Sequence, residues 1–478
     1  MRKMLESFIR TLGIFPLLWV AIFPVSSFGT SVGEIQDRRE SLVPEPIFNG
    51  RVYVQEAGRH HSKTVVLIHG LGTSASRDWE EIFPELAQKF HVLAFDLPGF
   101  GQSDAGNDLY SPSRYAELMD FLLPQFAKGP VHLVGHSMGG AIALCYAAEH
   151  PRNVSRLILA SVPGILHRQV YSRFLAQSGS RLLPDIFPQQ DAFLDRIAET
   201  VLRRAAGKPI PDAWILFTSL TREKFLQADP VRIAAFATAV EDFSPLIGRI
   251  ITPTLILWGT QDSIASPRTA TLLASQIPNA RLKWMKGAGH VLMKEQPKEF
   301  AGTLLAFLRE PDKSLSITQV TETAGSFAAI SKGTGRCQDQ SCTVFEGSYD
   351  AIEITNCRSV LLKNVRTPSV RILESSVIIE NSHIGPNKTA LSACRSEIVL
   401  TGGRIEGEIA VTSEESRLDF AGVTIVGKEA AVKVLASEDP RSGRSVPAAL
   451  FFSVCPIQSP RYSGYLHGAR VILPDRPL

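Results

Sequence analysis

Short apolar runs alternate with helix-like stretches between about residues 51 and 310. The runs are rich in Val, Ile and Leu and are only a few residues long, which is the pattern of strands buried on both faces. Strands that alternate with helices in this way predict a mainly parallel sheet flanked by helices. The expected strands cover residues 64–68, 91–95, 131–134, 154–159, 254–258 and 281–285.

Between residues 163 and 249 this alternation stops, and apolar residues take helical spacing, as in Phe193, Ile197 and Val201. Prolines punctuate the segment and separate its expected helices. The segment enters after one core strand and leaves before the next, so we expect a helical cap, or lid, over the strand ends. Such a cap excludes water and shapes a substrate pocket.

Helix signals fade after residue 311, and segments of about five apolar or β-branched residues recur at near-constant spacing. Each expected strand begins at a serine, and Ser359, Ser376, Ser396 and Ser416 lie 17, 20 and 20 residues apart. This repeat length suits a parallel β-solenoid, in which each coil buries its apolar face only against its neighbours. The pattern therefore predicts an all-β, right-handed parallel β-helix.

The first thirty residues have the pattern of a secretory signal. Arg2 and Lys3 precede a largely apolar run over residues 12–25, and small residues follow up to Gly29. We expect cleavage after Gly29 and export to the periplasm or the outside of the cell. An uncleaved membrane anchor is the alternative, although prolines interrupt the run and it is shorter than the roughly 20 residues of a spanning helix.

The 478 residues are too many for one ordinary core, so two domains are expected. The predicted divisions are a signal peptide (1–29), a linker (30–47), an α/β domain (48–312) that contains the cap (163–249), a second linker (313–330) and a β-helix domain (331–478).

The formal net charge is only +3, which favours neither nucleic acid nor an anionic membrane as a partner. The sequence has no clustered set of His and carboxylate residues, no phosphate-binding Gly-Lys loop and no dinucleotide-binding glycine fingerprint. Neither a metal nor an organic cofactor is expected.

The six cysteines fit an exported protein. Cys337 and Cys342 are close enough in sequence for a disulfide to close a small loop. Cys357 and Cys394 take matching positions two coils apart, which places them roughly 9.6 Å from each other, so we predict that these two are not bonded. Cys145, in an Ala-rich helical stretch, is expected to be a buried inert thiol.

The most informative motif is Gly135-His136-Ser137-Met138-Gly139, which ends a Val-rich strand and opens an Ala-rich helix. A serine on so tight a strand-to-helix turn is strained and exposed for attack, and the glycines on both sides let strand and helix approach. The N-terminus of the helix directs N–H groups toward charge that develops at the serine. Ser137 is therefore the expected nucleophile.

The chain here resembles the α/β-hydrolase superfamily, and in particular its esterase and lipase-like members, over most of residues 51 to 310. The resemblance implies an α/β-hydrolase fold and a serine hydrolase. It rests on the nucleophile motif and on the stretches Leu67-Ile68-His69-Gly70-Leu71-Gly72, Asp96-Leu97-Pro98-Gly99-Phe100-Gly101-Gln102-Ser103, Leu257-Trp258-Gly259-Thr260-Gln261-Asp262 and Gly287-Ala288-Gly289-His290.

The resemblance also implies the remaining site residues. In this fold the catalytic acid and base follow the serine in the order serine, acid, histidine, which assigns Asp262 and His290; Asp242 is the alternative acid. The backbone N–H groups of Leu71 and Met138 are the expected oxyanion donors.

Other residues near these motifs are expected to be structural. His69 and His136 more often pack or hydrogen-bond within their loops than act as a base. Trp79 is expected in the core, and Asp96 is expected to tie down the turn that follows it.

We expect hydrolysis of a carboxylic ester through an acyl-enzyme, with a small-molecule or lipid-like ester as substrate. The superfamily also includes amidases, thioesterases, C–C bond hydrolases and perhydrolases with the same triad. A second hypothesis is that the β-helix binds a polysaccharide that the hydrolase deacylates, or docks a protein partner. A third is a non-catalytic relative, against which the complete triad argues.

Overall fold

The computed structural model describes residues 37–167, 170, 173–174, 213–311, 331–435, 448–466 and 470–471. The predicted signal peptide, the second predicted linker and the centre of the predicted cap, with Phe193, Ile197 and Val201, lie outside the described residues. Within the described ranges, no helix has the length and apolar character needed to cross a membrane.

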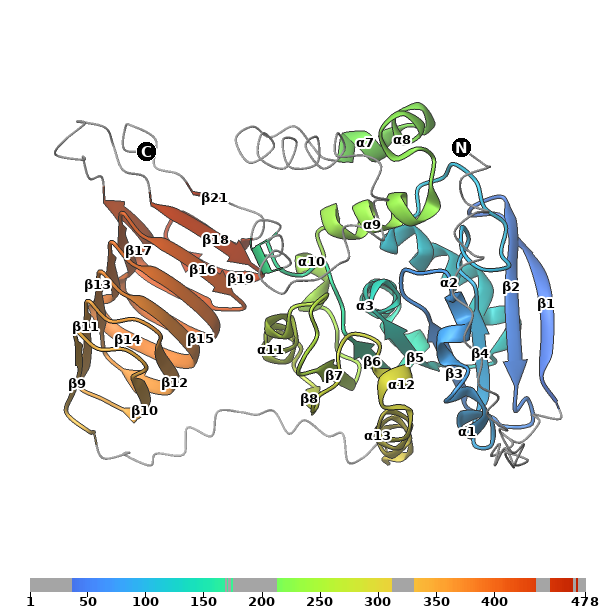
Figure 1. The fold of residues 1–478 in the computed structure, drawn as a ribbon, viewed down its shortest axis with the longest axis horizontal. Helices are drawn as coiled ribbons and strands as arrows, with labels where there is room; N and C mark the ends of the chain where they lie inside the picture. Colours follow the sequence, from blue (N-terminus) through green and yellow to red (C-terminus); the bar gives the residue numbers. More distant parts are fainter. Residues whose placement is uncertain are drawn as a thin grey trace, which may run out of the picture. The chain divides into compact units, whose positions relative to one another are not determined.

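The α/β region is built on one eight-stranded sheet with the order β1-β2-β4-β3-β5-β6-β7-β8 (Figure 1). β1 and β2 are antiparallel, and every pairing from β4 to β8 is parallel. The six predicted strands are all present within two residues of their expected ends. The strands are β1 (Arg39–Glu45), β2 (Gly50–Ala57), β3 (Thr64–Ile68), β4 (His91–Phe95), β5 (Val131–His136), β6 (Val154–Ala160), β7 (Thr254–Gly259) and β8 (Ala280–Met285).

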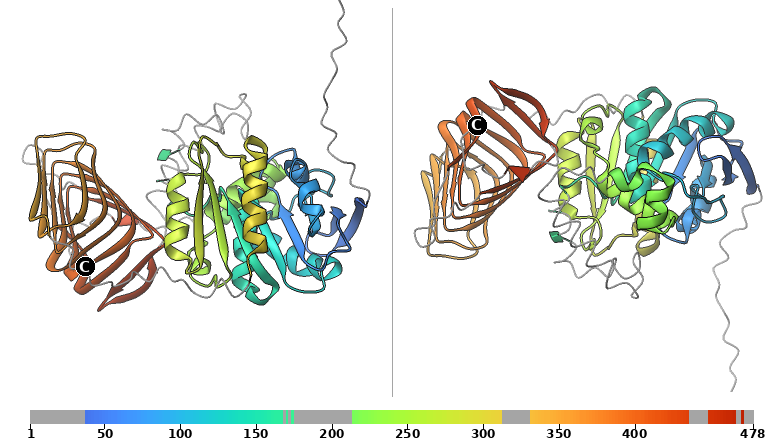
Figure 2. Two further views of the ribbon diagram at one scale, coloured as in Figure 1. Left: turned by 90° about the horizontal axis from the view of Figure 1, so that it is seen from below. Right: turned by 90° about the horizontal axis from the view of Figure 1, so that it is seen from above.

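Helices cover both faces of this sheet (Figure 2). One hydrophobic core joins the sheet to α2, α3 and α11, and a second joins its other face to α1 and α13. β3 and β4 are buried along their whole length because they are covered on both sides. The helices are η1 (Ala75–Trp79), α1 (Phe83–Ala87), α2 (Pro112–Phe126), α3 (Met138–Glu149), η2 (Pro151–Asn153), α11 (Pro267–Gln276), α12 (Leu292–Glu295) and α13 (Pro297–Arg309).

The described part of the predicted cap is helical and lies in the chain between β6 and β7. Its helices are α7 (Ala213–Phe217), α8 (Ser219–Leu226), α9 (Pro230–Val240) and α10 (Ser244–Ile247). Sequence signals define their ends: Thr218 caps α8 with its hydroxyl, and Asp229 caps α9 in front of a proline at the first helical position.

The C-terminal region is a stack of parallel coils, as the serine repeat predicted. Val360, Val377, Ile398, Leu418 and Leu450 pair in register and form one buried row along it. Its strands are β9 (Thr334–Gln338), β10 (Val344–Ser348), β11 (Ala351–Thr355), β12 (Val360–Thr367), β13 (Val370–Leu373), β14 (Ser376–Cys394), β15 (Glu397–Glu414), β16 (Arg417–Ala421), β17 (Thr424–Leu435), β18 (Ala449–Ser453), β19 (Cys455–Ser459), β20 (Tyr462–Leu466) and β21 (Arg470–Val471).

The coils turn at residues with left-handed backbone conformation. One corner has Asn364, Asn381, Gly402 and Gly422, with φ of 51°, 43°, 63° and 63°. Gly and Asn are the residues that adopt this conformation at least cost. Asn381 also donates to the side-chain oxygen of Asn364 at 3.0 Å, so the two asparagines link neighbouring coils at this corner.

The register of the serines differs by one residue from the prediction. Ser376 pairs with Glu397 rather than with Ser396. Ser396 instead accepts from the N–H of Ser375 at 3.1 Å, and Ser416 accepts from the N–H of Ser396 at 3.0 Å. Both serines of the pair at 375 and 376 make such contacts, because Ser376 accepts from the N–H of Ser359 at 3.1 Å while Ser375 donates to Ser396. The coil that follows Ser376 is therefore one residue longer than the prediction.

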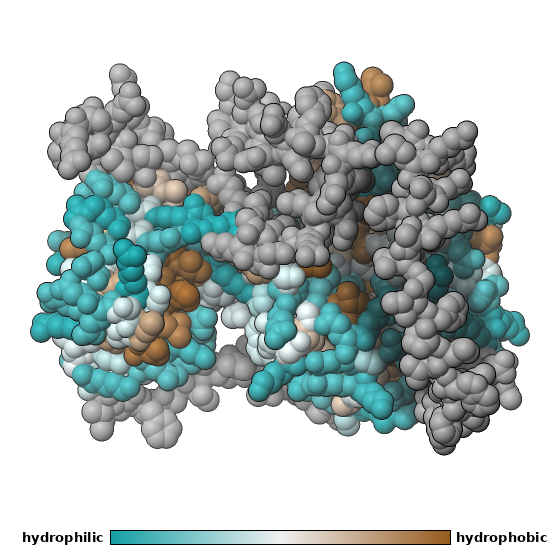
Figure 3. All heavy atoms as spheres, viewed as in Figure 1, coloured by the Kyte–Doolittle hydropathy of each residue, from teal (hydrophilic) through white to brown (hydrophobic). Residues whose placement is uncertain are grey.

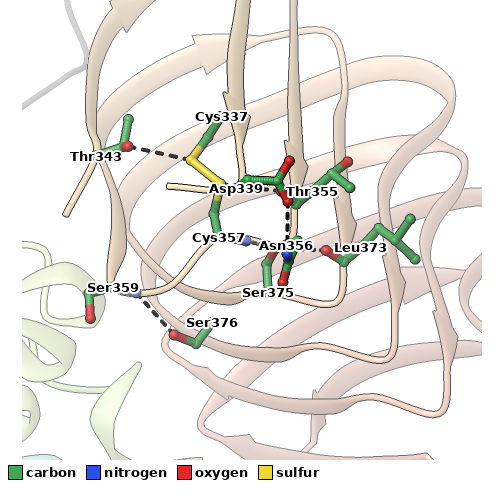
Figure 4. Close-up of a disulfide and its surroundings, with 10 residues drawn as sticks. All are labelled: Cys337, Asp339, Thr343, Thr355, Asn356, Cys357, Ser359, Leu373, Ser375 and Ser376. Atoms are coloured by element: carbon green, nitrogen blue, oxygen red, sulfur yellow. Dashed lines mark hydrogen bonds between the residues drawn. A yellow bond between two sulfur atoms is a disulfide. The ribbon is translucent and has the colours of Figure 1, made fainter. Parts of the chain in front are cut away.

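The cysteine pairing also differs from the prediction. Cys337 is bonded to Cys357, while Cys342 and Cys394 are free, so the expected bridge between Cys337 and Cys342 is wrong (Figure 4). The prediction that Cys357 and Cys394 are not bonded is confirmed, but their matching positions are not, because Cys394 pairs with Leu373. The disulfide joins the first two coils, whose strands β9 and β11 are neighbours.

The surface that Figure 3 shows is mainly hydrophilic, with a hydrophobic patch over the coils. Val344, Leu361, Ile378 and Val399 stand in one outward row of paired positions. Val344 is 61% exposed and Ile378 is 45% exposed. The coils therefore alternate a buried apolar row with an outer row that is partly apolar.

Candidate active site

The predicted nucleophile stands on a strained turn between β5 and α3. Ser137 has φ 53° and ψ −124°, a conformation that costs free energy for a residue with a side chain. A Cβ at Gly135 would lie 2.2 Å from the carbonyl oxygen of Gly139, so only glycine permits this approach of strand and helix. The N–H of Ser137 donates to the carbonyl of Ala160, which fastens the turn to β6.

The structure brings the three predicted triad side chains together. His290 Nε2 lies 3.1 Å from Ser137 Oγ, and His290 Nδ1 lies 3.1 and 3.0 Å from the two carboxylate oxygens of Asp262. In the tautomer that satisfies both contacts, Nδ1–H donates to the carboxylate and Nε2 accepts from the serine hydroxyl. A continuous hydrogen-bonded chain therefore joins three segments far apart in sequence.

Asp262 is buried but ionised. Burial alone would raise its pKa, yet hydrogen bonds from His290 and from the backbone N–H groups of Ile264 and Ala265 outweigh this, and the pKa lies below its ordinary value. The alternative acid, Asp242, accepts instead from the N–H and hydroxyl of Ser244. The geometry therefore places Asp262, and not Asp242, beside the histidine.

The acid and base loops follow neighbouring strands. Asp262 comes three residues after β7, and His290 comes five residues after β8, which pairs with β7. A Cβ at Gly259 would lie 2.1 Å from the carbonyl oxygen of Gly289. This glycine lets the two loops pass close enough for the side chains to meet.

The loop after β3 passes close to the nucleophile. A Cβ at Gly70 would lie 2.8 Å from the Cβ of Ser137. Met138 is the first residue of α3, so its N–H has no acceptor within the helix. In the described ranges, neither this N–H nor that of Leu71 donates to another residue of the protein.

Two other polar residues that we expected to be structural hold this loop and the next one. His69 Nε2 accepts from the N–H of Leu97 at 2.9 Å, and its Nδ1–H donates to the carbonyl of Gly70 at 2.7 Å. The Asp96 carboxylate accepts from the N–H groups of Ser76 and Gln102. These contacts fix the loops that follow β3 and β4.

Trp79 and Cys145 take the structural roles that the sequence predicts for them. The indole of Trp79 is fully buried in the core beside α13. Burial raises the pKa of the Cys145 thiol well above its ordinary value, which disfavours the reactive thiolate. Over the described part of the chain, no group of three or more His, Cys, Asp and Glu residues is arranged to hold a metal ion.

Two residues hold the loop of His290: Glu295, which the sequence analysis missed, and His136, which was expected to pack or hydrogen-bond within its own loop but bonds to the loop of His290 instead. His136 Nε2–H donates to the carbonyl of His290 at 2.9 Å, a role that the motif alone does not reveal. The Glu295 carboxylate accepts from the backbone on both sides of His290. The only sequence signal for Glu295 is a glutamate near the start of a short helix, where its side chain returns to preceding N–H groups much as in a capping box.

The comparison with protein families agrees with this geometry. The model of the alpha/beta hydrolase family matches residues 65–303, which include all three triad residues. This chain belongs to the alpha/beta hydrolase family. The predicted resemblance is thus confirmed, and the family match ends before the parallel coils begin.

Individual relatives cover the same part of this alpha/beta hydrolase. Lipase 1 of Psychrobacter immobilis is 27% identical over 257 residues, which are 53% of this chain and 78% of that protein. Human monoacylglycerol lipase ABHD6 is 26% identical over 270 residues, 52% of this chain and 76% of that protein. A solved structure of a membrane phospholipase A is 27% identical and covers 57% of this chain and 86% of its own, with a TM-score of 0.44.

Proposed function

We propose that this protein is a serine hydrolase that cleaves a carboxylic ester through an acyl-enzyme. The observation that carries the proposal is the hydrogen-bonded chain from Asp262 through His290 to Ser137, with the hydroxyl on a strained turn. A serine hydroxyl is a weak nucleophile unless an adjacent base takes its proton, and a third group must orient that base. The three side chains have the relative positions that this reaction needs.

In the first half of the reaction, His290 Nε2 takes the hydroxyl proton while Ser137 Oγ attacks the carbonyl carbon of the ester. Asp262 stabilises the imidazolium that forms. His290 then gives the proton to the alcohol oxygen, the carbon–oxygen bond of the ester breaks, and the acyl group remains on the serine. In the second half, His290 takes a proton from water, which attacks the acyl carbon and releases the acid.

The tetrahedral oxyanion needs donors that are in place before the charge develops. The N–H groups of Leu71 and Met138 are proposed for this role. Their having no acceptor in the described protein supports it, as does the position of Met138 at the positive end of α3. Leu71 acts through its backbone in this scheme, so its side chain is replaceable.

The substrate class rests on the relatives. Lipases among the similar proteins support a carboxylic ester, which is one of several bond classes that the same triad cleaves. A small-molecule or lipid-like ester is therefore proposed, and the length of its acyl chain is the first property to measure.

A fluorophosphonate probe tests the mechanism directly. The full chain is expected to be labelled at Ser137 and to hydrolyse p-nitrophenyl esters, with a preferred chain length when acyl groups of increasing length are compared. Ser137→Ala is expected to lose labelling and to lower kcat about 10⁶-fold, since the base has no nucleophile to activate. Labelling at another residue, or full activity of the variant, contradicts the proposal.

We also propose that the protein is exported from the cytosol. The N-terminal pattern supports it, and so does the disulfide between Cys337 and Cys357, because disulfides persist mainly in oxidising compartments. Cell fractionation followed by N-terminal sequencing of the mature protein tests this part. Cytosolic protein that begins at residue 1 contradicts export and leaves the catalytic proposal unaffected.

A further inference from the structure

The proposed catalytic base, His290, lies in a loop, residues 286–291, that contains two glycines. Gly287 has φ 77°, and Gly289 has no side chain. Glycine loses more conformational freedom on folding than any other residue. The imidazole of His290 must nevertheless keep both hydrogen bonds of the triad. Hydrogen bonds to the backbone of this loop therefore fix the position of the His290 imidazole.

The Glu295 carboxylate holds the peptide N–H groups on both sides of His290. Its Oε2 accepts from the N–H of Gly289 at 2.5 Å, and its Oε1 accepts from the N–H of Val291 at 2.9 Å. Bonds from N–H groups to a carboxylate are roughly twice as strong as those between neutral groups. A Cβ at Gly289 would lie 3.1 Å from both carboxylate oxygens, so this glycine leaves room for the contact.

His136 holds the third peptide group, the carbonyl of His290 itself. The distance from Nε2 to this oxygen is 2.9 Å, and the His136 side chain is buried beside Trp79. Burial lowers the pKa of His136 to about 4, so the ring is neutral and donates a single proton. Its Nδ1 has no hydrogen-bond partner in the described structure, so the contact with His290 is the one polar bond of the ring.

We infer that Glu295 and His136 are positioning residues, which clamp the peptide groups around His290 from two sides and hold the base in line with Ser137. The inference rests on the proposed function, because it concerns the base of that reaction. Both residues hydrogen-bond to backbone groups rather than to the reacting atoms, and the His136 ring also packs against the His290 ring, with centroids 4.9 Å apart. Glu295 acts from the exposed side of the loop, and His136 acts from the buried side.

The clamp matters because proton transfer is sensitive to position. A base displaced by about 1 Å loses on the order of 100-fold in rate, while the substrate still binds. Loss of the clamp should therefore lower kcat and leave KM nearly unchanged. A residue with a merely structural role would lower stability and the amount of active enzyme, but would not change the kcat of each active molecule.

Glu295→Ala is expected to lower kcat about 10- to 100-fold, with KM within about twofold of the wild-type value. Active sites are counted by fluorophosphonate titration, so that kcat refers to folded enzyme. Glu295→Gln should lose less, since its amide oxygen still accepts from one N–H group. The matched control is Glu299→Gln on α13, where an exposed glutamate forms an ion pair with Lys283; its kcat should not change.

His136→Gln and His136→Leu test the hydrogen bond from His136 to the carbonyl of His290. Glutamine carries an N–H donor at a distance from the backbone similar to that of Nε2, so it should retain most of kcat. Leucine has no donor, leaves the His290 carbonyl unpaired and should lower kcat about tenfold or more. Equal activity of these two variants, at equal numbers of active sites, overturns the role given to His136.

The outcomes separate this inference from the proposed function. Wild-type protein that is neither labelled by the probe nor active on esters refutes the proposed function. Wild-type protein that is labelled and active, with Glu295→Ala and His136→Leu both within twofold of it in kcat, refutes the clamp and leaves the proposed function standing.

Discussion

The two regions of this chain use buried polar groups in opposite ways. In the α/β region, Asp262 and the adjacent residues His136 and Ser137 come from two distant segments and converge around His290. Among the coils, Ser396 and Ser416 lie on neighbouring coils and repeat the same hydrogen bond. The first arrangement concentrates reactive groups at one point, whereas the second distributes polar contacts along the stack.

The strands of the two regions also differ in which of their residues are buried. β3 and β4 are buried at every position, because helices cover both faces of their sheet. β14 and β15 alternate buried and outward residues over much of their length, because a solenoid has only one inner face. A substitution that disturbs one polar group should therefore change activity in the first region and local stability in the second.

The largest expected effect is on activity and comes from Asp262→Asn. The amide cannot stabilise the imidazolium and favours the wrong tautomer of His290, so kcat should fall about 10⁴-fold. Folding should change far less, because the amide oxygen can still accept from the N–H groups of Ile264 and Ala265. Steady-state kinetics and a thermal melt measure the two effects.

Asp242→Asn is the control, since this carboxylate bonds to Ser244 and not to the base. Near-native turnover is expected from it. An inactive Asp242→Asn enzyme, beside an active Asp262→Asn enzyme, would reverse the assignment of the acid.

The next effect is on stability and comes from Cys357→Ser, which breaks the bridge to Cys337. The two cysteines are 20 residues apart in sequence, and a disulfide that closes a loop of this size stabilises by about 3 kcal/mol. Amide hydrogen exchange should become faster in residues 334–355, while kcat keeps its wild-type value. The free, exposed Cys342 provides the control, because Cys342→Ser should change neither quantity.

Much of the α/β fold is predictable from the sequence because its strands are buried throughout. A short, largely apolar run bounded by turns is typical of such a strand, as in 64–68 and 91–95. β1 escapes prediction because it is exposed along most of its length and carries no apolar run. β1 forms through its hydrogen bonds to β2, and its own sequence has no alternation of apolar residues that would reveal a strand.

The triad is predictable because each member stands in a motif with its own backbone requirement. Ser137 lies between two glycines, and His290 follows Gly287 and Gly289. The contact of Glu295 is not predictable, because it depends on the path of a loop and no motif encodes it. The predicted register of the coils is wrong by one residue after Ser376, because that residue pairs with Glu397 and not with the serine before it. A slip of one residue exchanges inward and outward positions.

The smallest expected effect comes from Ser396→Ala, within the hydroxyl ladder. Ser396 Oγ donates to the carbonyl of Cys394 at 2.7 Å and accepts from the N–H of Ser375 at 3.1 Å. Alanine leaves that buried N–H unpaired, which costs about 1–3 kcal/mol. Hydrogen exchange should become faster in strands β13 to β16, with kcat unchanged. Ser392→Ala, on an outward row and half-buried, should have almost no effect. A loss of kcat in Ser396→Ala at unchanged local stability would mean that polar groups of the coils serve catalysis as well, and the contrast between the two regions would fail.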